Sequence, residues 1–388
     1  MEHPYSPGLE GIPAAQSSIA HIDGEKGMLY YRGYPVEDLA GKSSFEETSY
    51  LLLYGDLPSK ESLTRHALRL AEARSVPPTI LDMLYDLPKK THPMHALATA
   101  LCAMTPFAGD ATILTEPATS ETRQTFIDQN TIHLIAVFPS LVASWARIRK
   151  NLSPLAPRTD LGHAANFLWM LTEKEPDETV AHLMDVCLVL HAEHTFNAST
   201  FTVRVASSSL PHPWPVMTTG VVSLSGPLHG GANEEVLKML EHIGTTEKAA
   251  SFLEEQLAQK RKIWGMGHRE YRTKDPRAKI MEKLVHDYAR KKGGAVDPLF
   301  QVALALEEAA QDKLGPKGVW PNVDFYSGIV YREMGIETDL FTPIFAIARI
   351  AGWCAHWKEQ MASNRIYRPT QVYTGQAPRH YAPLDARA

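Results

Sequence analysis

The sequence is poor in cysteine, and the three cysteines that it contains are far apart. Cys102, Cys187 and Cys354 form no CxxC pair within the 388 residues. Disulfide frameworks and thiolate metal sites both need several cysteines at short, regular spacing. The sequence therefore argues against a disulfide-stapled secreted module and favours a reducing compartment, so we expect the protein to be cytoplasmic.

A large excess of charge of one sign is also lacking. The chain has 39 Lys and Arg residues against 44 Asp and Glu residues, which gives a formal net charge of -5. Such a balance creates no overall field that would attract nucleic acid or an acidic membrane surface. We expect neither of these partners, and any anion binding must therefore be local.

Long hydrophobic runs, targeting signals and internal repeats are scarce as well. The longest apolar stretch, residues 132–145, is interrupted by His133, Pro139 and two serines, and it is too short to cross a bilayer. It predicts a buried, kinked helix. Residues 1–13 have neither the basic nor the apolar region of a signal peptide, and none is expected. The lack of repeats argues against a solenoid array.

Helical signals are abundant. Ser44 followed by Glu47 is typical of a capping box, and the pairs Pro58-Ser59 and Pro176-Asp177 each precede apolar residues at helical spacing. A short strand is expected only near residues 28–31. The predicted fold class is therefore all-α, with a main domain and a smaller one.

The segment 226–236 places a glycine-flanked histidine, His229, just before an expected helix whose N-cap would be Asn233. The positive end of a helix dipole disfavours imidazolium. His229 should therefore stay neutral and be able to donate a hydrogen bond to a carbonyl that becomes an enolate. A tight glycine turn with an incidental histidine is the alternative.

The segment 265–277 combines His268 with four basic residues, and Asp275 and Pro276 are expected as N-cap and first residue of a helix. Arginine binds carboxylates through two parallel hydrogen bonds, and basic side chains also meet phosphates. A dianionic acid and a phosphorylated cofactor are thus natural ligands. A solvated charged loop is the alternative interpretation.

Two further residues have unusual surroundings. Asp324 lies among apolar and aromatic neighbours in residues 320–328, where desolvation would raise its pKa toward that of a general base. Arg349 lies in an otherwise apolar helix, where a guanidinium needs an anion or an internal carboxylate. Asp324 could instead be a simple turn or cap residue.

A possible metal pair occurs in residues 191–194. His191 and His194 share a helix face, and a zinc hydrolase that uses them with Glu193 must be considered. The signal is weak, because a catalytic zinc usually takes three protein ligands and no HExxH spacing is present. No metal is expected.

Taken together, these segments resemble the citrate synthase family. The resemblance lies in the order of GLEGI (8–12), SSFEE (43–47), HAEHTFNAST (191–200), GPLHGGANEEV (226–236), GMGHREYRTKDPRA (265–278), PNVDFYSG (321–328), FAIARIAGW (345–353) and RPTQVYTG (368–375). It implies a large helical domain, residues 1–230 and 336–388, and a small helical domain, residues 231–335, with the active site in the cleft between them.

The resemblance also implies an enzyme that condenses acetyl-CoA with oxaloacetate and hydrolyses citryl-CoA to citrate and CoA. Asp324 would take a methyl proton, His229 would stabilise the enolate, and His268 would protonate the oxaloacetate ketone. The remaining matches fall into two groups. Oxaloacetate would be bound by His194, Arg277, Phe345, Arg349 and Arg368. CoA would lie along Ile263, Gly265, Met266, Gly267 and Arg272.

The resemblance further implies a homodimer in which Arg368 reaches into the neighbouring subunit, and no permanently bound cofactor. Related sequences often have valine where Glu270 stands, which puts CoA affinity in doubt. The chain begins close to GLEGI, as in the shorter bacterial forms without an N-terminal NADH-regulatory domain, so we expect little NADH inhibition.

Two alternatives share the fold. A 2-methylcitrate synthase would favour propionyl-CoA, and one methylene in an apolar pocket changes the binding energy by only about 1 to 3 kcal/mol. The other is an inactive helical scaffold, which the presence of every matched catalytic residue disfavours.

Overall fold

The computed structural model describes residues 5–115, 119–291, 293–294 and 296–387. Within these ranges the chain forms sixteen α-helices, several short 3-10 turns and one small sheet, which confirms the all-α prediction. The helices are α1 Val36–Lys42, α2 Phe45–Tyr54, α3 Lys60–Glu72, α4 Pro78–Asp86, α5 Pro93–Ala103, α6 Ser120–Ile148, α7 His163–Thr172, α8 Glu178–His191, α9 Ala198–Ser207, α10 Pro213–Leu224, α11 Ala232–Ile243, α12 Ala249–Ala258, α13 Pro276–Lys291, α14 Pro298–Leu314, α15 Val323–Glu333 and α16 Phe341–Ala362. The first four residues, where no signal peptide is expected, lie outside the described ranges.

Local capping signals determine where several helices begin. The Ser44 side chain accepts a hydrogen bond from the Glu47 amide, Ser59 accepts one from Ser62, and Asp177 accepts one from Val180. Each bond satisfies an amide that has no partner within the first turn of its helix. The starts of α2, α3 and α8 are therefore as the sequence predicts.

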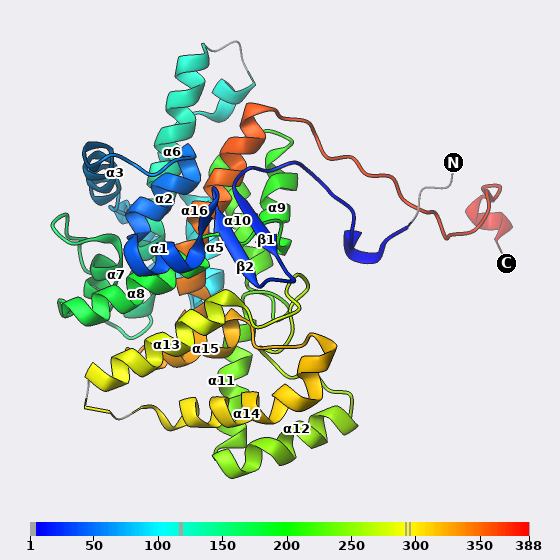
Figure 1. Ribbon diagram of the computed structural model, residues 1–388. Helices are drawn as coiled ribbons and strands as arrows, with labels where there is room; N and C mark the ends of the chain where they lie inside the picture. Colours follow the sequence, from blue (N-terminus) through cyan, green and yellow to red (C-terminus); the bar gives the residue numbers. More distant parts are fainter. Residues whose placement is uncertain (1–4, 116–118, 292, 295, 388) are drawn as a thin grey trace.

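Helix α16 forms the centre of the protein. It packs against α2, α5, α6, α8, α9, α10 and α11, and Figure 1 shows it running through the upper part of the molecule. Nearly every residue from Phe341 to Trp357 is buried. This helix, which carries Arg349 and Phe345, is thus a rigid base for any site built upon it.

Among the described residues, one helix, α6, is long and apolar enough to span a bilayer, but 94% of its most apolar window is buried inside the protein. The helix covers 29 residues and contains Pro139. The apolar stretch 132–145 is therefore buried as predicted. It belongs to a longer helix, which polar residues from Ser120 onward extend at its N-terminal end.

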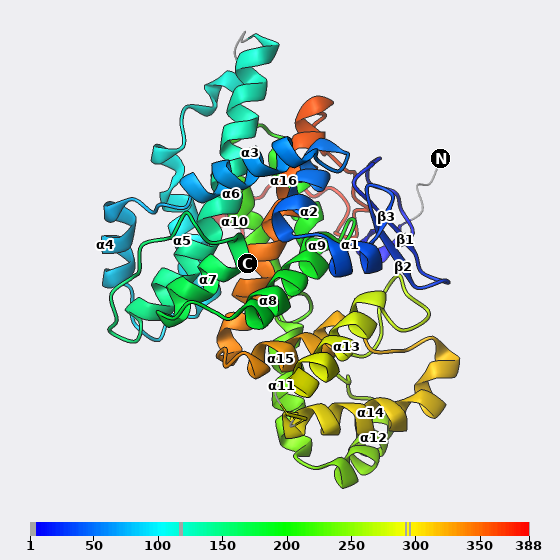
Figure 2. The same cartoon turned by 60° about the vertical axis from the view of Figure 1, so that its left-hand side comes forward.

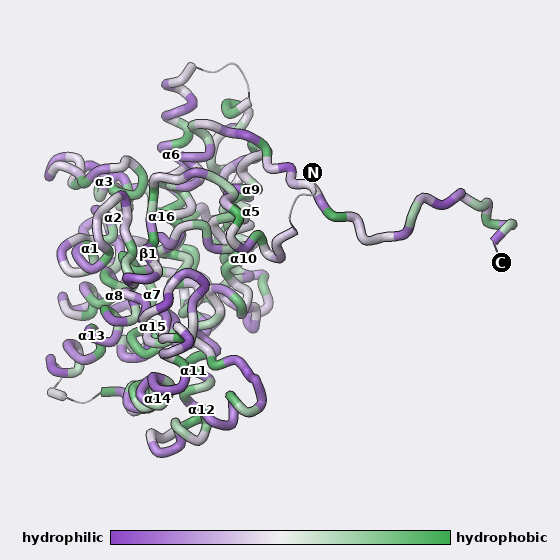
Figure 3. The backbone as a smooth tube through the Cα atoms, turned by 45° about the vertical axis from the view of Figure 1, so that its right-hand side comes forward, coloured by the Kyte–Doolittle hydropathy of each residue, from purple (hydrophilic) through white to green (hydrophobic). Residues whose placement is uncertain are grey.

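Helices α11 to α15 gather at one end of the molecule, where α13 and α11 pack against α15 and α12 packs against α14 (Figures 1 and 2). At the other end the segment after α16 leaves the body as an extended arm, seen from another side in Figure 3. Most of residues 363–387 are exposed. Such an arm has little to pack against within its own chain.

The sheet is a three-stranded antiparallel meander of β1 Ala20–Asp23, β2 Met28–Tyr31 and β3 Tyr34–Pro35. Strand β2 matches the strand predicted at residues 28–31. The turn between β1 and β2 touches the 268–274 loop, because the Arg272 amide donates to the Gly24 carbonyl at 3.0 Å. A Cβ atom at Gly24 would lie 2.0 Å from the Glu270 carbonyl oxygen. The hairpin thereby fixes the outer side of this loop.

Candidate active site

Two segments that are far apart in the sequence lie side by side and carry His268 and Asp324. Met266 and Pro321 form an isolated antiparallel bridge. The Gly267 amide donates to the Trp320 carbonyl at 2.8 Å, and the Asn322 amide donates to the Gly265 carbonyl at 2.9 Å. The expected CoA segment and the expected general base are therefore parts of one local structure.

His268 is held in a single tautomer. Its Nδ1 accepts hydrogen bonds from the amides of Glu270 at 3.0 Å and Tyr271 at 3.4 Å. Nδ1 therefore carries no proton, and Nε2 is the donor nitrogen. Burial lowers the pKa of His268 to about 4, although the Asp275 carboxylate opposes this effect. The imidazole is thus a neutral hydrogen-bond donor near neutral pH.

His194 lies beside His268, with the two ring centroids 5.0 Å apart and nearly perpendicular. Its Nε2 is 3.1 Å from the Tyr271 hydroxyl. Burial, together with the positive charges of Arg277 and Arg349, lowers the pKa of His194 well below its usual value. This histidine is also neutral.

Arg277 is buried and forms a bidentate salt bridge with Asp275. Its Nε and Nη2 donate to the two carboxylate oxygens at 3.1 and 2.7 Å, and its amide donates to Oδ1 at 2.9 Å. Burial disfavours both charges, but their mutual attraction lowers the pKa of Asp275 and raises that of Arg277. Asp275 thus caps α13, as predicted, and also orients the guanidinium.

Arg349 is fully buried and has no carboxylate within ion-pair distance in the described part of the chain. Its Nε donates to the His191 carbonyl at 2.8 Å, its guanidinium lies over the Phe345 ring, and its Nη2 has no hydrogen-bond partner. Burial lowers the pKa of Arg349 to about 10. Of the two partners that the sequence leaves open, an external anion is therefore favoured.

His229 is half-buried and meets the N-terminus of α9. Its Nε2 lies 2.8 Å from the Ser199 hydroxyl and accepts from the Ser199 amide at 3.3 Å. Burial, and then the charge of Arg349, lowers the pKa of His229 to about 3. The prediction that this imidazole is neutral therefore agrees with its surroundings, but the contacting helix is α9 and not α11.

The expected cap of α11 was wrong. The helix begins at Ala232 with Gly231 as its N-cap, and Asn233 lies in the first turn, fully buried. The Thr342 hydroxyl on α16 reaches the Asn233 side-chain oxygen at 3.4 Å. The helix thus begins two residues earlier than predicted, and Asn233 contacts α16 instead of capping its own helix.

Asp324 lies in the first turn of α15, whose cap is Asn322. The Oδ1 atom of Asp324 is buried and has no hydrogen-bond partner in the described part of the chain. Burial raises its pKa to about 7, while Arg277 and Arg349 oppose the shift. A carboxylate with this pKa and a free oxygen has the properties of a general base.

Electrostatic influence joins these residues into one site. Arg349 acts on the pKa of His194, His229 and Asp324, and Arg277 acts on that of His194, His268 and Asp324.

Two expected ligands lie apart. Arg272 is exposed, and Arg368 is exposed on the C-terminal arm, where it donates to the Pro369 carbonyl.

The segment expected to contact CoA has a backbone conformation that favours glycine at two positions. Gly265 and Gly267 both have positive φ angles, and a Cβ atom at Gly265 would lie 3.0 Å or less from atoms of Val236 and Phe325. Ile263 and Met266 are buried beside them. Glycine at position 265 thus lets the 263–267 segment lie against α11 and α15.

Each of the three residues in the zinc hydrolase hypothesis forms its hydrogen bond with a different partner. The Nδ1 of His191 bonds the Cys187 carbonyl, Glu193 pairs with His356, and His194 faces Tyr271. A different trio, His194, His268 and Asp275, has ligand atoms within 4.8 Å of one another. Both oxygens of Asp275 already accept from Arg277, and two buried guanidinium groups lie nearby, so this environment favours an anion over a cation.

Several residues of the site escaped the sequence analysis. Ser199 and Tyr271 contact His229 and His194, respectively. Asn197 caps α9 and thereby positions the Ser199 amide. Of these, only Asn197 left a signal, because asparagine is one of the preferred N-cap residues at a helix start.

The structure brings together neutral imidazoles, a carboxyl of raised pKa and two buried arginines, an arrangement that is typical of enzymes that transfer protons and bind anions. Residues 8–370 match the family described as citrate synthase, C-terminal domain. The chain belongs to the citrate synthase family and is an enzyme of this type.

Relatives and solved structures agree over the full length. The chain is 46% identical to the citrate synthase of Acidithiobacillus ferridurans, over 99% of this chain and 98% of that protein, and 41% identical to the citrate synthase of Deinococcus radiodurans, over 98% of each. The citrate synthase structure from Pyrobaculum aerophilum has a TM-score of 0.92 at 38% identity and covers 100% of this chain and 97% of that one.

A third structure contains ligands. It is a ternary complex of carboxymethyl coenzyme A and oxaloacetate with the citrate synthase of Thermoplasma acidophilum. Its TM-score is 0.91 at 29% identity, and the match covers 100% of both chains. The fold that surrounds the site described above is therefore one that holds these two ligands in a relative.

Proposed function

We propose that the protein condenses the methyl carbon of acetyl-CoA with the ketone carbon of oxaloacetate and hydrolyses the resulting citryl-CoA to citrate and CoA. The observation that carries the proposal is the Asp324 Oδ1 atom, which has no hydrogen-bond partner among the described residues. It shares one electrostatic neighbourhood with the neutral His229 and with Arg349, whose Nη2 also lacks a partner among those residues. A base, an enolate stabiliser and an anion site are thereby present together.

The first step is removal of a methyl proton. Asp324 takes the proton, and the electron pair moves onto the thioester oxygen to give an enol or enolate. Because Nε2 of His229 accepts from the Ser199 amide, its proton is on Nδ1, and Nδ1 donates to that oxygen. An imidazole of pKa about 3 stays neutral throughout.

The second step forms the carbon–carbon bond. The enolate carbon attacks the oxaloacetate ketone, whose oxygen receives the Nε2 proton of His268. Arg277, Arg349 and His194 hold the oxaloacetate, and the Phe345 ring supports Arg349 at 4.8 Å from its guanidinium carbon. Water then attacks the thioester carbonyl of citryl-CoA and releases CoA as a thiol.

The remaining parts of the site belong to the same proposal. The homodimer would bring Arg368 of one chain, on its extended arm, to the oxaloacetate of the other. The division into a large domain, residues 1–230 and 336–388, and a small domain, residues 231–335, is supported by the packing of α11 to α15 on one another. CoA would follow residues 263–267, with Arg272 near its phosphates.

The test measures thioester loss by the purified protein with oxaloacetate, for acetyl-CoA and propionyl-CoA, with and without EDTA. Thioester absorbance is preferable to a thiol reagent because Cys102 is exposed. A preference for acetyl-CoA that EDTA does not change is expected. A propionyl-CoA preference would indicate a 2-methylcitrate synthase, and no turnover with either substrate would contradict the proposal.

A further inference from the structure

The turn between β1 and β2 lies against the peptide group that orients the His268 imidazole. A Cβ atom at Gly24 would lie 2.0 Å from the Glu270 carbonyl oxygen and 2.9 Å from the carbonyl carbon. That carbon is bonded to the Tyr271 nitrogen, whose N–H donates to Nδ1 of His268 at 3.4 Å. A peptide group is rigid and planar, so its oxygen and its N–H move together. Any displacement of this oxygen therefore moves a donor to His268.

Further contacts join the turn to the same loop. The Gly24 carbonyl accepts a hydrogen bond from the Arg272 amide at 3.0 Å. A Cβ atom at Gly27 would lie 2.5 Å from the Cγ2 atom of Thr273. The turn therefore packs along the loop and does not touch it at one point alone.

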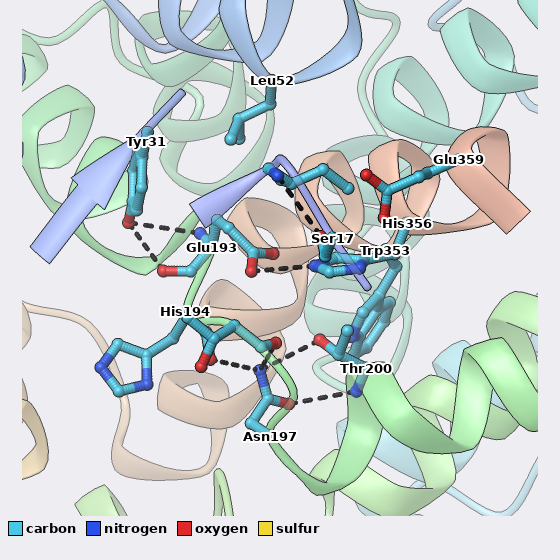
Figure 4. A network of polar contacts seen from close by, with 12 residues as sticks. Ser17, Tyr31, Leu52, Glu193, His194, Asn197, Thr200, Trp353, His356 and Glu359 are labelled. Atoms are coloured by element: carbon cyan, nitrogen blue, oxygen red, sulfur yellow. Dashed lines mark hydrogen bonds and ion pairs between the residues drawn. The ribbon is translucent and has the colours of Figure 1, made fainter. Parts of the chain in front are cut away.

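The hairpin that carries this turn is itself firmly held. The Lys26 amide and Nζ donate to the two carboxylate oxygens of Asp23 at 3.0 and 2.9 Å. On β2, the buried Tyr31 donates through its hydroxyl to the Glu193 carbonyl at 2.8 Å, and Figure 4 shows this contact directly beside His194. The hairpin is thus fixed next to one imidazole of the site, and its turn touches the loop of another.

The two imidazoles meet between these contacts. Nε2 of His194 is 3.1 Å from the Tyr271 hydroxyl, and the ring centroids of His194 and His268 are 5.0 Å apart. The hydroxyl of Tyr271 thus contacts one histidine while its amide contacts the other. A shift of the peptide between residues 270 and 271 would change both relations.

We propose that the β1–β2 turn is a positioning element for His268, in which Gly24 and Gly27 let the chain approach closely enough to keep the 270–271 peptide in place. That peptide and the Glu270 amide hold Nδ1 as an acceptor, so the imidazole proton stays on Nε2. If the amides move away, the proton can occupy Nδ1 instead, and Nε2 then has no proton for the ketone. The inference rests on the proposed role of His268 as proton donor to oxaloacetate.

The arginine that binds oxaloacetate is held independently of this turn. Nζ of Lys274 donates to Glu282 and Glu307 at 2.6 Å each, which anchors the end of the loop that leads into α13 and Arg277. A displacement that starts at the turn should therefore reach His268 and leave Arg277 in place. Proton transfer should suffer more than oxaloacetate binding.

The decisive variant is Gly24→Ala in the full-length protein, because Gly24 lies outside the left-handed φ region and the added methyl group acts by contact alone. The kcat, measured by thioester loss, should fall roughly ten- to hundredfold, whereas the Kd for oxaloacetate, measured by calorimetry, should change less than about threefold. Gly33→Ala is the matched control in the other turn of the sheet, since its φ is +89° and no atom lies within 4 Å of the added group. It should lower stability and leave kcat unchanged.

A second pair of variants keeps the test valid if Gly24→Ala does not fold. Gly27→Ala places a methyl group against Cγ2 of Thr273 and should lower kcat. Adding Thr273→Ser removes Cγ2 and should restore much of the kcat, although the strain at Gly27, with φ of +63°, remains. Rescue of this kind is expected from a contact and not from general destabilisation.

Several results would overturn the inference. They are a folded Gly24→Ala protein with normal kcat, parallel losses of kcat and oxaloacetate binding, an equal loss of kcat in Gly33→Ala, and a Gly27→Ala defect that Thr273→Ser does not relieve. His268→Ala separates the inference from the proposed function, because it should lose nearly all turnover. An active His268→Ala enzyme would contradict the proposed chemistry itself, whereas an inactive one beside a normal Gly24→Ala enzyme would contradict only the role of the turn.

Discussion

The Ser199 amide donates to Nε2 of His229 at 3.3 Å, and the Ser199 hydroxyl lies 2.8 Å from the same nitrogen. Ser199 is the second residue of α9, so the positive end of that helix faces the imidazole. The contact leaves the His229 proton on Nδ1, which is the tautomer that an enolate stabiliser needs.

Replacing Ser199 by alanine should therefore weaken catalysis and leave substrate binding intact. The hydroxyl contacts with His229, Asn197 and Trp353 are lost while the backbone amide remains. The contact with His229 is worth about 1 kcal/mol, which corresponds to a roughly five- to tenfold lower kcat. The KM for oxaloacetate should stay unchanged. Ser207→Ala is the control, because the hydroxyl of this buried serine of α9 donates to the Arg204 carbonyl of its own helix. Equal losses in both variants would argue against the assigned role of Ser199.

Asp324→Asn should lower kcat by roughly two to four orders of magnitude, because the general base is removed. In the unmodified enzyme, kcat/KM should rise with pH up to about 7, the pKa to which burial raises Asp324. The protonation of His229 and His268 should not affect the pH profile near pH 7, since their pKa values are about 3 and about 4. Near-normal turnover in a folded Asp324→Asn enzyme would contradict the base assignment.

The same carboxyl predicts a stability effect of definite sign. Its folded pKa of about 7 lies above the ordinary value of 3.8, so the folded protein binds this proton more tightly than the unfolded chain. Its contribution to stability is lost as pH rises toward 7. Asp324→Asn should raise Tm at pH 8 more than at pH 5, with a gain of at most about 4 kcal/mol. Thermal unfolding at the two pH values measures this difference, and a lower Tm at pH 8 would be the opposite result.

The sequence predicts the local parts of this structure well, because they depend on residues close together in the chain. The caps at Ser44, Ser59 and Asp177 need only a polar side chain and an amide three residues later. The neutral state of His229 and the raised pKa of Asp324 were also inferred correctly. For Asp324 the cause was also correct, because its apolar neighbours in the sequence indicate burial. For His229 the sequence predicted the neutral form from the dipole of the following helix, whereas the main cause in the structure is burial.

The rest depends on tertiary contacts that no local pattern contains. Ser199 and His229 are 30 residues apart, and Glu193 and His356 are 163 residues apart. Asparagine is a typical N-cap residue, but the side chain of Asn233 is buried at the contact with α16. The family resemblance supplied the residues of the site, while their tautomers and partners required the fold.

Gly265→Ala should raise the KM for acetyl-CoA and destabilise the protein. The φ angle of Gly265 is +75°, and the added methyl group would lie 2.8 Å from Val236 and 3.0 Å from the Phe325 Cα. Gly335→Ala is the control for backbone strain alone, since its φ is +73° and no atom lies within 4 Å of the added group. That control should lose only about 1 kcal/mol. Equal losses in the two variants, measured by denaturant unfolding, would show that the close contacts do not matter.

Arg368 offers a test of the proposed dimer that does not require another structure. Arg368→Ala and Asp324→Asn homodimers should both be nearly inactive. In a mixed dimer, an arginine that acts across the interface leaves one site with both defects and the other with neither. Random mixing should then restore roughly a quarter of the normal kcat, because half of the dimers are mixed and each has one intact site. An arginine that acts within its own chain leaves one defect in every site, and mixing would restore no activity.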